Sequence, residues 1–170
     1  MRTLTVMALV GFALPVAGVE PPEGWRLPTS QELAHEPLRL DSATRFAEAL
    51  ADFDGDEGFD TALLLKTTRL SGEGLLVKLS SRSEEHWLVL DEIDWGEEHA
   101  SVNLVMGIDV LAPGVYQTAC GKGYRDCAPE EPAELKLALP GLLYFKFESA
   151  SSIFYWDEGS HGFKRVWISD

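Results

Sequence analysis

The stretch Asp52–Asp60, with the sequence DFDGDEGFD, places carboxylates at the spacing of a metal-binding loop. With Asp52 as position 1, further aspartates stand at positions 3, 5 and 9, and a glycine at position 7. A hard cation such as calcium takes roughly six to eight oxygen ligands, which carboxylates and carbonyls on a tightly curved loop supply. Without a cation, carboxylates this close would repel one another or take up protons. We therefore predict a calcium site, with ligands from Asp52, Asp54, Asp56, Asp60 and the carbonyl of Gly58.

The longer stretch DFDGDEGFDTALLL resembles the calcium loop of FG-GAP and VCBS repeats, which read approximately DxDGDGxxDxA before an apolar strand. The resemblance implies that the four aspartates are ligands. Those families carry several repeats that form a β-propeller, whereas this chain has one copy, so no propeller is implied. Glu57 stands at position 6, where the families have a glycine for a sharp turn. Leu63 stands where an EF-hand has a bidentate glutamate, so the loop is not an EF-hand. The alternative is a solvated acidic turn.

Other groups of reactive side chains lack a catalytic spacing. The triplets Glu84-Glu85-His86 and Glu97-Glu98-His99 flank an expected strand, but no HExxH pattern is present, so they read as polar turns. Ser160-His161 is not part of a GxSxG nucleophile elbow. A hydrolase that assembles its carboxylate and histidine groups from distant positions stays open as an alternative.

Cys120 and Cys127 are the two cysteines of the chain, and their even number and close spacing predict a disulfide if the protein is exported. That disulfide would close the loop CGKGYRDC, in which tyrosine and basic residues gather. A rigid loop of this composition favours recognition, because little entropy is lost on binding. The candidate partner-binding residues are Tyr116, Lys122, Tyr124 and Arg125. A loop stapled only for stability is the alternative.

The first residues and the net charge bear on location and partners. Residues 1–18 contain one basic residue, a short apolar run and small residues at the end, which is typical of a signal peptide. The run is too short to span a bilayer, so we expect no membrane insertion after cleavage and a periplasmic or secreted protein. The net charge of −14 disfavours nucleic acid and favours basic protein surfaces as partners.

The elements that must position these residues follow from turn signals and periodicity. Residues 19–170 are expected to form a single α+β domain. Thr29–Glu32 matches a capping box and predicts a short helix, and residues 43–51 have apolar positions at helical spacing. After the acidic loop, short apolar segments alternate with turn residues and predict strands. The predicted fold is thus one or two N-terminal helices packed on a mostly antiparallel β-sheet.

Together these features predict an exported calcium-binding protein that acts as a binding or inhibitory module, similar to an immunity protein, rather than as an enzyme. The alternatives are a periplasmic hydrolase that uses carboxylate and histidine residues, and a purely structural envelope protein.

Overall fold

The computed structural model describes residues 19–34, 36–39, 42, 44–69, 71–82, 86–96 and 103–169. The predicted signal peptide at residues 1–18 lies outside them. The helical elements are α1 (Ser30–Leu33) and the 3-10 turn η1 (Pro37–Arg39). The strands are β1 (Trp25–Arg26), β2 (Glu48–Ala51), β3 (Asp60–Thr67), β4 (Gly72–Lys78), β5 (Trp87–Asp94), β6 (Met106–Leu111), β7 (Gly114–Gln117), β8 (Glu134–Leu137), β9 (Gly141–Lys146), β10 (Ser151–Asp157) and β11 (Gly162–Ser169).

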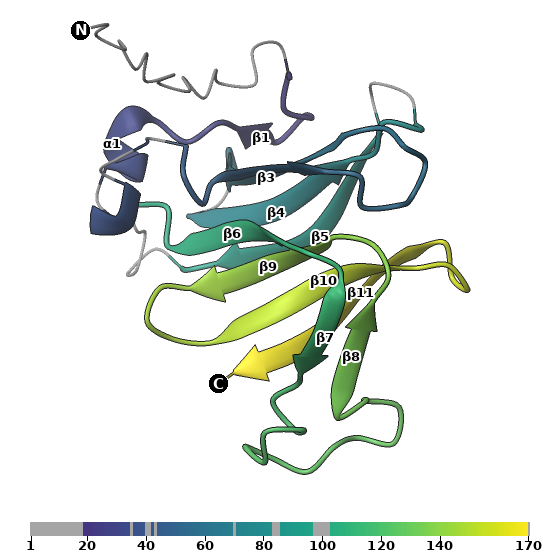
Figure 1. The fold of residues 1–170 in the computed structure, drawn as a ribbon. Helices are drawn as coiled ribbons and strands as arrows, with labels where there is room; N and C mark the ends of the chain where they lie inside the picture. The colour runs from purple at the N-terminus through teal and green to yellow at the C-terminus, as the bar shows by residue number, and fades with distance from the viewer. Residues whose placement is uncertain are drawn as a thin grey trace, which may run out of the picture.

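The strands form two antiparallel sheets and a two-stranded ribbon (Figure 1). The first sheet has the order β1-β3-β4-β5. Both β2 and β1 pair with β3, β2 with its first half and β1 with its last residues. The second sheet has the order β11-β10-β9-β6. The β7–β8 ribbon lies against the outer face of the second sheet, where Leu135 and Leu137 pack on Ile153 and Val166.

The main hydrophobic core lies between the two sheets. Side chains alternate along each strand, so every second residue of the inner strands points into this space. A fully buried leucine here contributes about 1.5–3 kcal/mol of transfer free energy. The core residues include Leu64, Leu75 and Val77 from the first sheet and Ile108, Leu142, Tyr144 and Phe154 from the second.

The sheets are joined along one side and open along the other. On the joined side, the Leu64 amide donates to the Ala47 carbonyl (2.9 Å) and the Ile108 amide donates to the Phe46 carbonyl (2.9 Å). On the open side, Asp91 of edge strand β5 pairs with Arg165 of edge strand β11 (3.0 Å). The two edge strands therefore meet through side chains rather than through a backbone ladder.

The prediction of an α+β fold with N-terminal helices on a sheet is wrong, because the described residues form an almost all-β structure. The Thr29–Glu32 capping box is confirmed, but α1 is a single turn. Residues 48–51 of the second expected helix form strand β2 instead. Their burial alternates with period two, since Ala49 and Ala51 are buried and Leu50 is half exposed. Pairing with β3 thus outweighs the helical spacing.

The strands predicted after the acidic loop are largely confirmed as β3, β4, β5, β6, β8, β9, β10 and β11. The last two form a hairpin, in which Asp157 pairs with Gly162 across the turn. No helix among the described residues is long and apolar enough to cross a membrane.

Candidate metal site in the loop between β2 and β3

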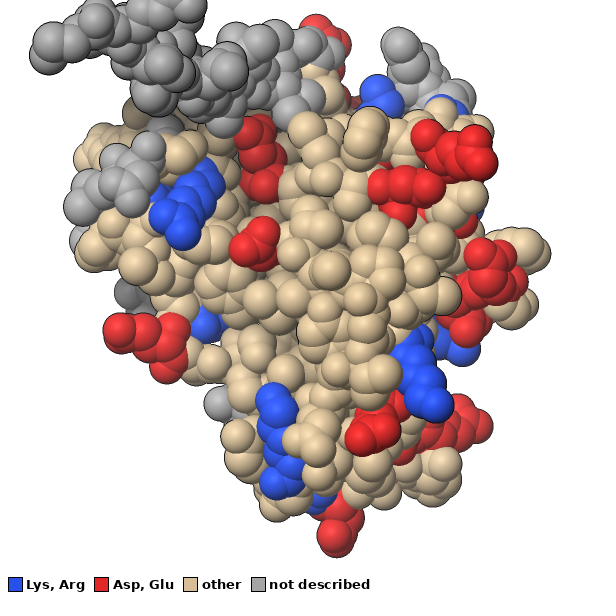
Figure 2. Space-filling model, viewed as in Figure 1, with Lys and Arg blue, Asp and Glu red and all other residues tan. Residues whose placement is uncertain are grey.

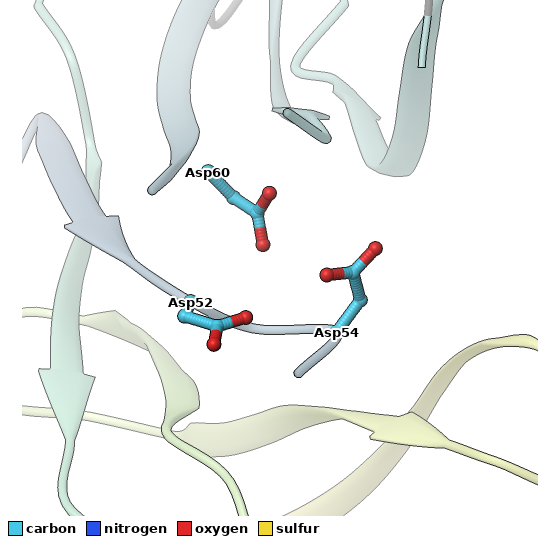
Figure 3. A group of neighbouring side chains, drawn as sticks. All are labelled: Asp52, Asp54 and Asp60. Atoms are coloured by element: carbon cyan, nitrogen blue, oxygen red, sulfur yellow. The ribbon is translucent and has the colours of Figure 1, made fainter. Parts of the chain in front are cut away.

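The loop that joins β2 to β3 gathers three of the predicted ligands. Carboxylate oxygens of Asp52, Asp54 and Asp60 lie within 4.8 Å of one another. Figure 3 shows the three carboxyl groups pointing toward a common space, two from the start of the loop and Asp60 from the first residue of β3. A carboxylate cluster of this kind can hold a metal ion, because the ion replaces mutual repulsion by attraction.

Asp52 folds the loop back on itself. One of its carboxylate oxygens accepts from the amides of Gly55 (2.7 Å) and Asp56 (3.1 Å), and the other accepts from the amide of Glu57 (3.0 Å). An aspartate that bonds to backbone amides a few residues later is the usual way to stabilise a tight turn. Asp52 therefore stabilises the curved backbone of the loop and also contributes negative charge to the site.

Asp60 is completely buried and ties the loop to its surroundings. Its two oxygens accept from the Phe53 amide (2.8 Å) and the Ser80 amide (2.8 Å). Burial raises the pKa of Asp60, the two backbone hydrogen bonds oppose the rise, and the charges of Asp54 and Asp56 add to it. A cation beside Asp60 would lower this pKa, so metal binding and the ionised carboxylate favour each other.

Asp56 and Gly58, the other two predicted ligands, are not part of the cluster of three carboxylates. Asp56 accepts from the Gly58 amide (2.7 Å) and from the Ser80 hydroxyl (3.0 Å), so its carboxylate faces the β4–β5 turn. A side chain at Gly58 would collide with Ser80, which explains a glycine at this place. The structure thus groups three of the four predicted carboxylates, and Asp56 links the loop to the neighbouring turn.

Ser80 and Ser81, in the turn that follows β4, are site residues that sequence reasoning missed. The Ser81 hydroxyl donates to Asp54 (3.0 Å), and Ser80 contacts both Asp56 and Asp60. They lie 20 or more positions from the acids that they contact, and serine is common in turns. No local pattern could have selected them.

Glu57, which replaces the glycine of the family pattern, adopts the left-handed conformation with a φ of 68°. The sharp turn is therefore kept, although a residue with a Cβ is strained there by about 1 kcal/mol.

We expect Glu57→Gly to raise the free energy of unfolding by up to about 0.5 kcal/mol, because the strain removed is at least as large as the stability lost through the added freedom of the unfolded chain. Urea denaturation in chelator measures this change. Gly96 also has a positive φ, of 73°, so Gly96→Ala should shift stability in the opposite direction. A Glu57→Gly variant less stable than wild type would contradict the strain argument.

The predicted disulfide between Cys120 and Cys127 is present, with a Cα–Cα distance of 4.9 Å. It lies in the loop between β7 and β8, at the bottom of Figure 1. Lys122 donates to the Ile168 carbonyl (2.9 Å), and Arg125 forms an ion pair with Glu131. Tyr124 is 58% exposed. Tyr116 packs beside the β8 leucines and donates to the Ala112 carbonyl (2.7 Å), so it also supports the ribbon.

The other predicted clusters are only partly described. Glu84, Glu85, Glu97, Glu98 and His99 lie outside the described residues. His86 is exposed and lies 3.0 Å from the Arg82 guanidinium. Ser160 donates to Asp157 (2.7 Å), while neighbouring His161 occupies a left-handed position in the hairpin turn. The Ser160 hydroxyl thus acts in turn formation.

No family model, curated protein or solved structure matches this chain. The interpretation of the site therefore rests on its own geometry and chemistry.

Proposed function

We propose that this protein is an exported calcium-binding protein that acts by binding another protein rather than by catalysis. The observation that carries the proposal is the convergence of Asp52, Asp54 and Asp60 from the two ends of one loop. The resemblance of the loop to FG-GAP and VCBS calcium loops supports the same ion.

Oxygen chemistry favours calcium over softer metals. The three clustered side chains offer carboxylate oxygens only, and hard cations prefer such ligands, whereas zinc and copper favour nitrogen and sulfur. Each carboxylate oxygen that accepts an amide hydrogen has a second lone pair with which it can bind a metal. Water and the predicted Gly58 carbonyl would complete the coordination.

The bound ion would act as a clamp. The loop contacts the β4–β5 turn through Ser80 and Ser81 and lies against Leu139 in the turn between β8 and β9. Neutralising the acids would therefore stabilise the contacts among the β2–β3 loop, the β4–β5 turn and the β8–β9 turn. Metal binding that favours the folded state in this way adds directly to stability.

Charge supports a basic protein as the partner. Figure 2 shows Asp and Glu side chains gathered on the right side of the view, around the end where the β2–β3 loop lies in Figure 1. An acidic surface of this kind attracts and orients a basic partner. Export is supported by the disulfide, since such bonds persist in oxidising compartments.

We expect calcium at about 100 times its dissociation constant to stabilise the protein by about 2.7 kcal/mol relative to chelator, which corresponds to about 5–10 °C in Tm. Asp54→Asn should abolish this shift, because the amide removes a charged ligand and keeps the shape of the side chain. Thermal melting followed by circular dichroism measures both effects.

Asp126→Asn is the matched control, since Asp126 is exposed and lies in the disulfide loop, and it should keep the full calcium shift. Asp56→Asn separates the two ligand sets: a retained shift supports a site of Asp52, Asp54 and Asp60, and a lost shift supports the full set predicted from the sequence. If wild type and Asp54→Asn melt alike in calcium and in chelator, the calcium proposal fails.

A further inference from the structure

An apolar pocket of about 130 Å³ lies beside β3, next to the point where β2 begins to pair with it. An engineered apolar cavity of about 150 Å³ takes up benzene, so a pocket of this size has room for one small group. The apolar residues of its wall come from the segment before α1, from α1 and from the β2–β3 pair: Leu27, Pro28, Leu33, Ala47, Leu63 and Leu64.

Glu48 brings a single charge to this pocket. Among the described residues of the wall it is the only charged one, and Thr44 is the only other residue whose side chain can form hydrogen bonds. Glu48 is half-buried, and within the described part of the chain its side chain takes part in no hydrogen bond or ion pair. A partly buried carboxylate beside an apolar wall is stabilised by a cation that can reach it. The pocket therefore suits a small apolar group that carries a positive charge.

Val19 lies on the same face of the first sheet as Glu48. Glu48 stands directly opposite Leu63 in the β2–β3 ladder, so the side chains of this pair point to one face. Val19 packs against the cluster of Leu63, Leu65 and Leu76 and also lines the pocket. Val19 and Glu48 thus both flank Leu63.

The segment that follows Val19 is held against the first sheet. Trp25 belongs to β1, which pairs with the end of β3 (Figure 1), and its ring fills the space beside Gly74, where a Cβ would collide with it. Arg26 donates two hydrogen bonds to Glu32 of α1 (2.8 and 2.7 Å). Because these contacts fix the chain a few residues after Val19, less conformational entropy is lost when Val19 itself becomes ordered.

We propose that the predicted signal peptide is removed between Gly18 and Val19, and that the α-ammonium group created by this cleavage pairs with Glu48 and closes the pocket. The cleavage is a hydrolysis by a signal peptidase. The peptide bond between the two residues breaks, the oxygen of a water molecule joins the carbonyl carbon of Gly18, and a proton goes to the nitrogen of Val19.

Cleavage changes the charge at the pocket. In the uncleaved chain the Val19 nitrogen is an uncharged amide, whereas a free α-amino group is mostly protonated at pH 7. The valine side chain can stay on the apolar wall while its ammonium group neutralises Glu48, so processing stabilises the N-terminal segment on the first sheet. This pairing rests on the export part of the proposed function and is independent of the calcium site, with which the pocket shares no residue.

The pairing is tested on the chain of residues 19–170, which contains every element of the described fold. The pKa of the Val19 α-amino group, followed by NMR, is expected to be at least about 0.3 higher in wild type than in Glu48→Gln, because Glu48 favours the charged form. Glu134→Gln is the matched control and should leave this pKa unchanged. Glu134 is likewise the first residue of a strand, but it is exposed and does not line the pocket.

Acetylation of the Val19 amine supplies a second readout. It is expected to lower the Tm of wild type by about 1–3 °C at pH 6, since it removes a charge that is paired in the folded state. The Tm of Glu48→Gln should not change on acetylation. Because pairing raises the pKa of the amine, the effect is fully present below the unfolded pKa of about 7.7–8.0 and is lost as the pH rises through the raised value.

The cleavage site is tested with the full chain, expressed in a Gram-negative bacterium. Mass spectrometry of the exported protein is expected to show a chain that begins at Val19. A chain that begins at another residue overturns the inference and leaves export in place, whereas a chain that stays unprocessed in the cytoplasm overturns both. A missing calcium shift in a chain with normal pairing contradicts only the calcium proposal.

Three results from the chain of residues 19–170 would also overturn the inference: an equal α-amino pKa in wild type and Glu48→Gln, an equal change of this pKa in Glu134→Gln, or an equal loss of Tm on acetylation with and without Glu48. A small molecule that native mass spectrometry finds on wild type and not on Glu48→Gln would assign the pocket to that ligand instead.

Discussion

Glu73→Ala is expected to lower the free energy of unfolding by about 3–5 kcal/mol, because it removes the carboxylate that balances buried positive charge. Glu73 is completely buried in β4 and lies 3.7 Å from the buried ammonium group of Lys66. Its carboxylate also accepts from the amides of Met106 (2.7 Å) and Val105 (3.0 Å). These bonds hold the start of β6 against the first sheet.

Arg39 also binds the segment that leads into β6, by donating to the backbone carbonyls of that segment. Its guanidinium donates to the carbonyls of Met106 (2.7 Å) and Leu104 (3.1 Å) and is almost fully buried. Charged side chains thus bond both the amides and the carbonyls of the residues that lead into β6. Removing Glu73 would leave backbone amides unsatisfied as well as a charge, and each such group costs about 1–3 kcal/mol.

Urea denaturation of Glu73→Ala and Glu92→Ala measures the effect. Glu92 is an exposed acid on β5 of the same sheet, and its replacement should change stability by less than about 0.5 kcal/mol. A Glu73→Ala variant that folds and loses less than about 1 kcal/mol would refute the role of the buried pair.

Glu73 also gives stability a dependence on pH. Burial raises the pKa of Glu73 above its ordinary value, although the backbone bonds from Val105 and Met106 and the charges of Lys66 and Arg39 oppose the rise. The folded protein therefore holds this proton to higher pH than the unfolded chain does. The stability of wild type relative to Glu73→Gln should fall as the pH rises from the ordinary glutamate pKa through the raised one. A difference that rises over this interval would contradict the sign.

Phe53→Ala is expected to cost about 3–5 kcal/mol, as removal of a buried aromatic ring does. Phe53 lies inside the acidic loop between two candidate ligands, yet its side chain is completely buried and its ring lies 6.4 Å from that of Phe163. Because this ring anchors the loop to the core, the variant should also weaken calcium binding.

Phe59 supplies the control within the same loop. Its side chain is 79% exposed, so Phe59→Ala should change stability by less than about 0.5 kcal/mol and leave the calcium shift intact. Chemical denaturation and calcium titration of both variants check the pair. Equal effects of the two replacements would show that Phe53 does not anchor the loop.

Much of the strand pattern and part of the candidate site could be predicted because the signals are local. The aspartate spacing between Asp52 and Asp60 curves the loop through hydrogen bonds to amides only a few residues away. The disulfide joins cysteines whose sequence separation is 7. Both strands of the final hairpin were also predicted as apolar segments, and they pair with each other because they are neighbours in the chain.

The second expected helix shows where local pattern fails. Phe46, Ala49 and Leu50 have helical spacing, but Phe46 takes a left-handed φ of 61° and packs beside Phe145 and Phe147. The partners that decide its conformation lie about a hundred positions later. The segment is rich in alanine and other helix-forming residues, but propensity is a weak preference in a short segment and its tertiary contacts outweigh it.

The sequence by itself determined the acid spacing, the disulfide and the strand-forming segments, because each depends on neighbouring residues. Only the tertiary structure decided which acids converge, that Ser80 and Ser81 complete the surroundings of the loop, and that Glu73, Lys66 and Arg39 are buried together. Composition alone would place charged residues on the surface. Their burial becomes favourable only where the fold brings opposite charges and unpaired backbone groups to the same place.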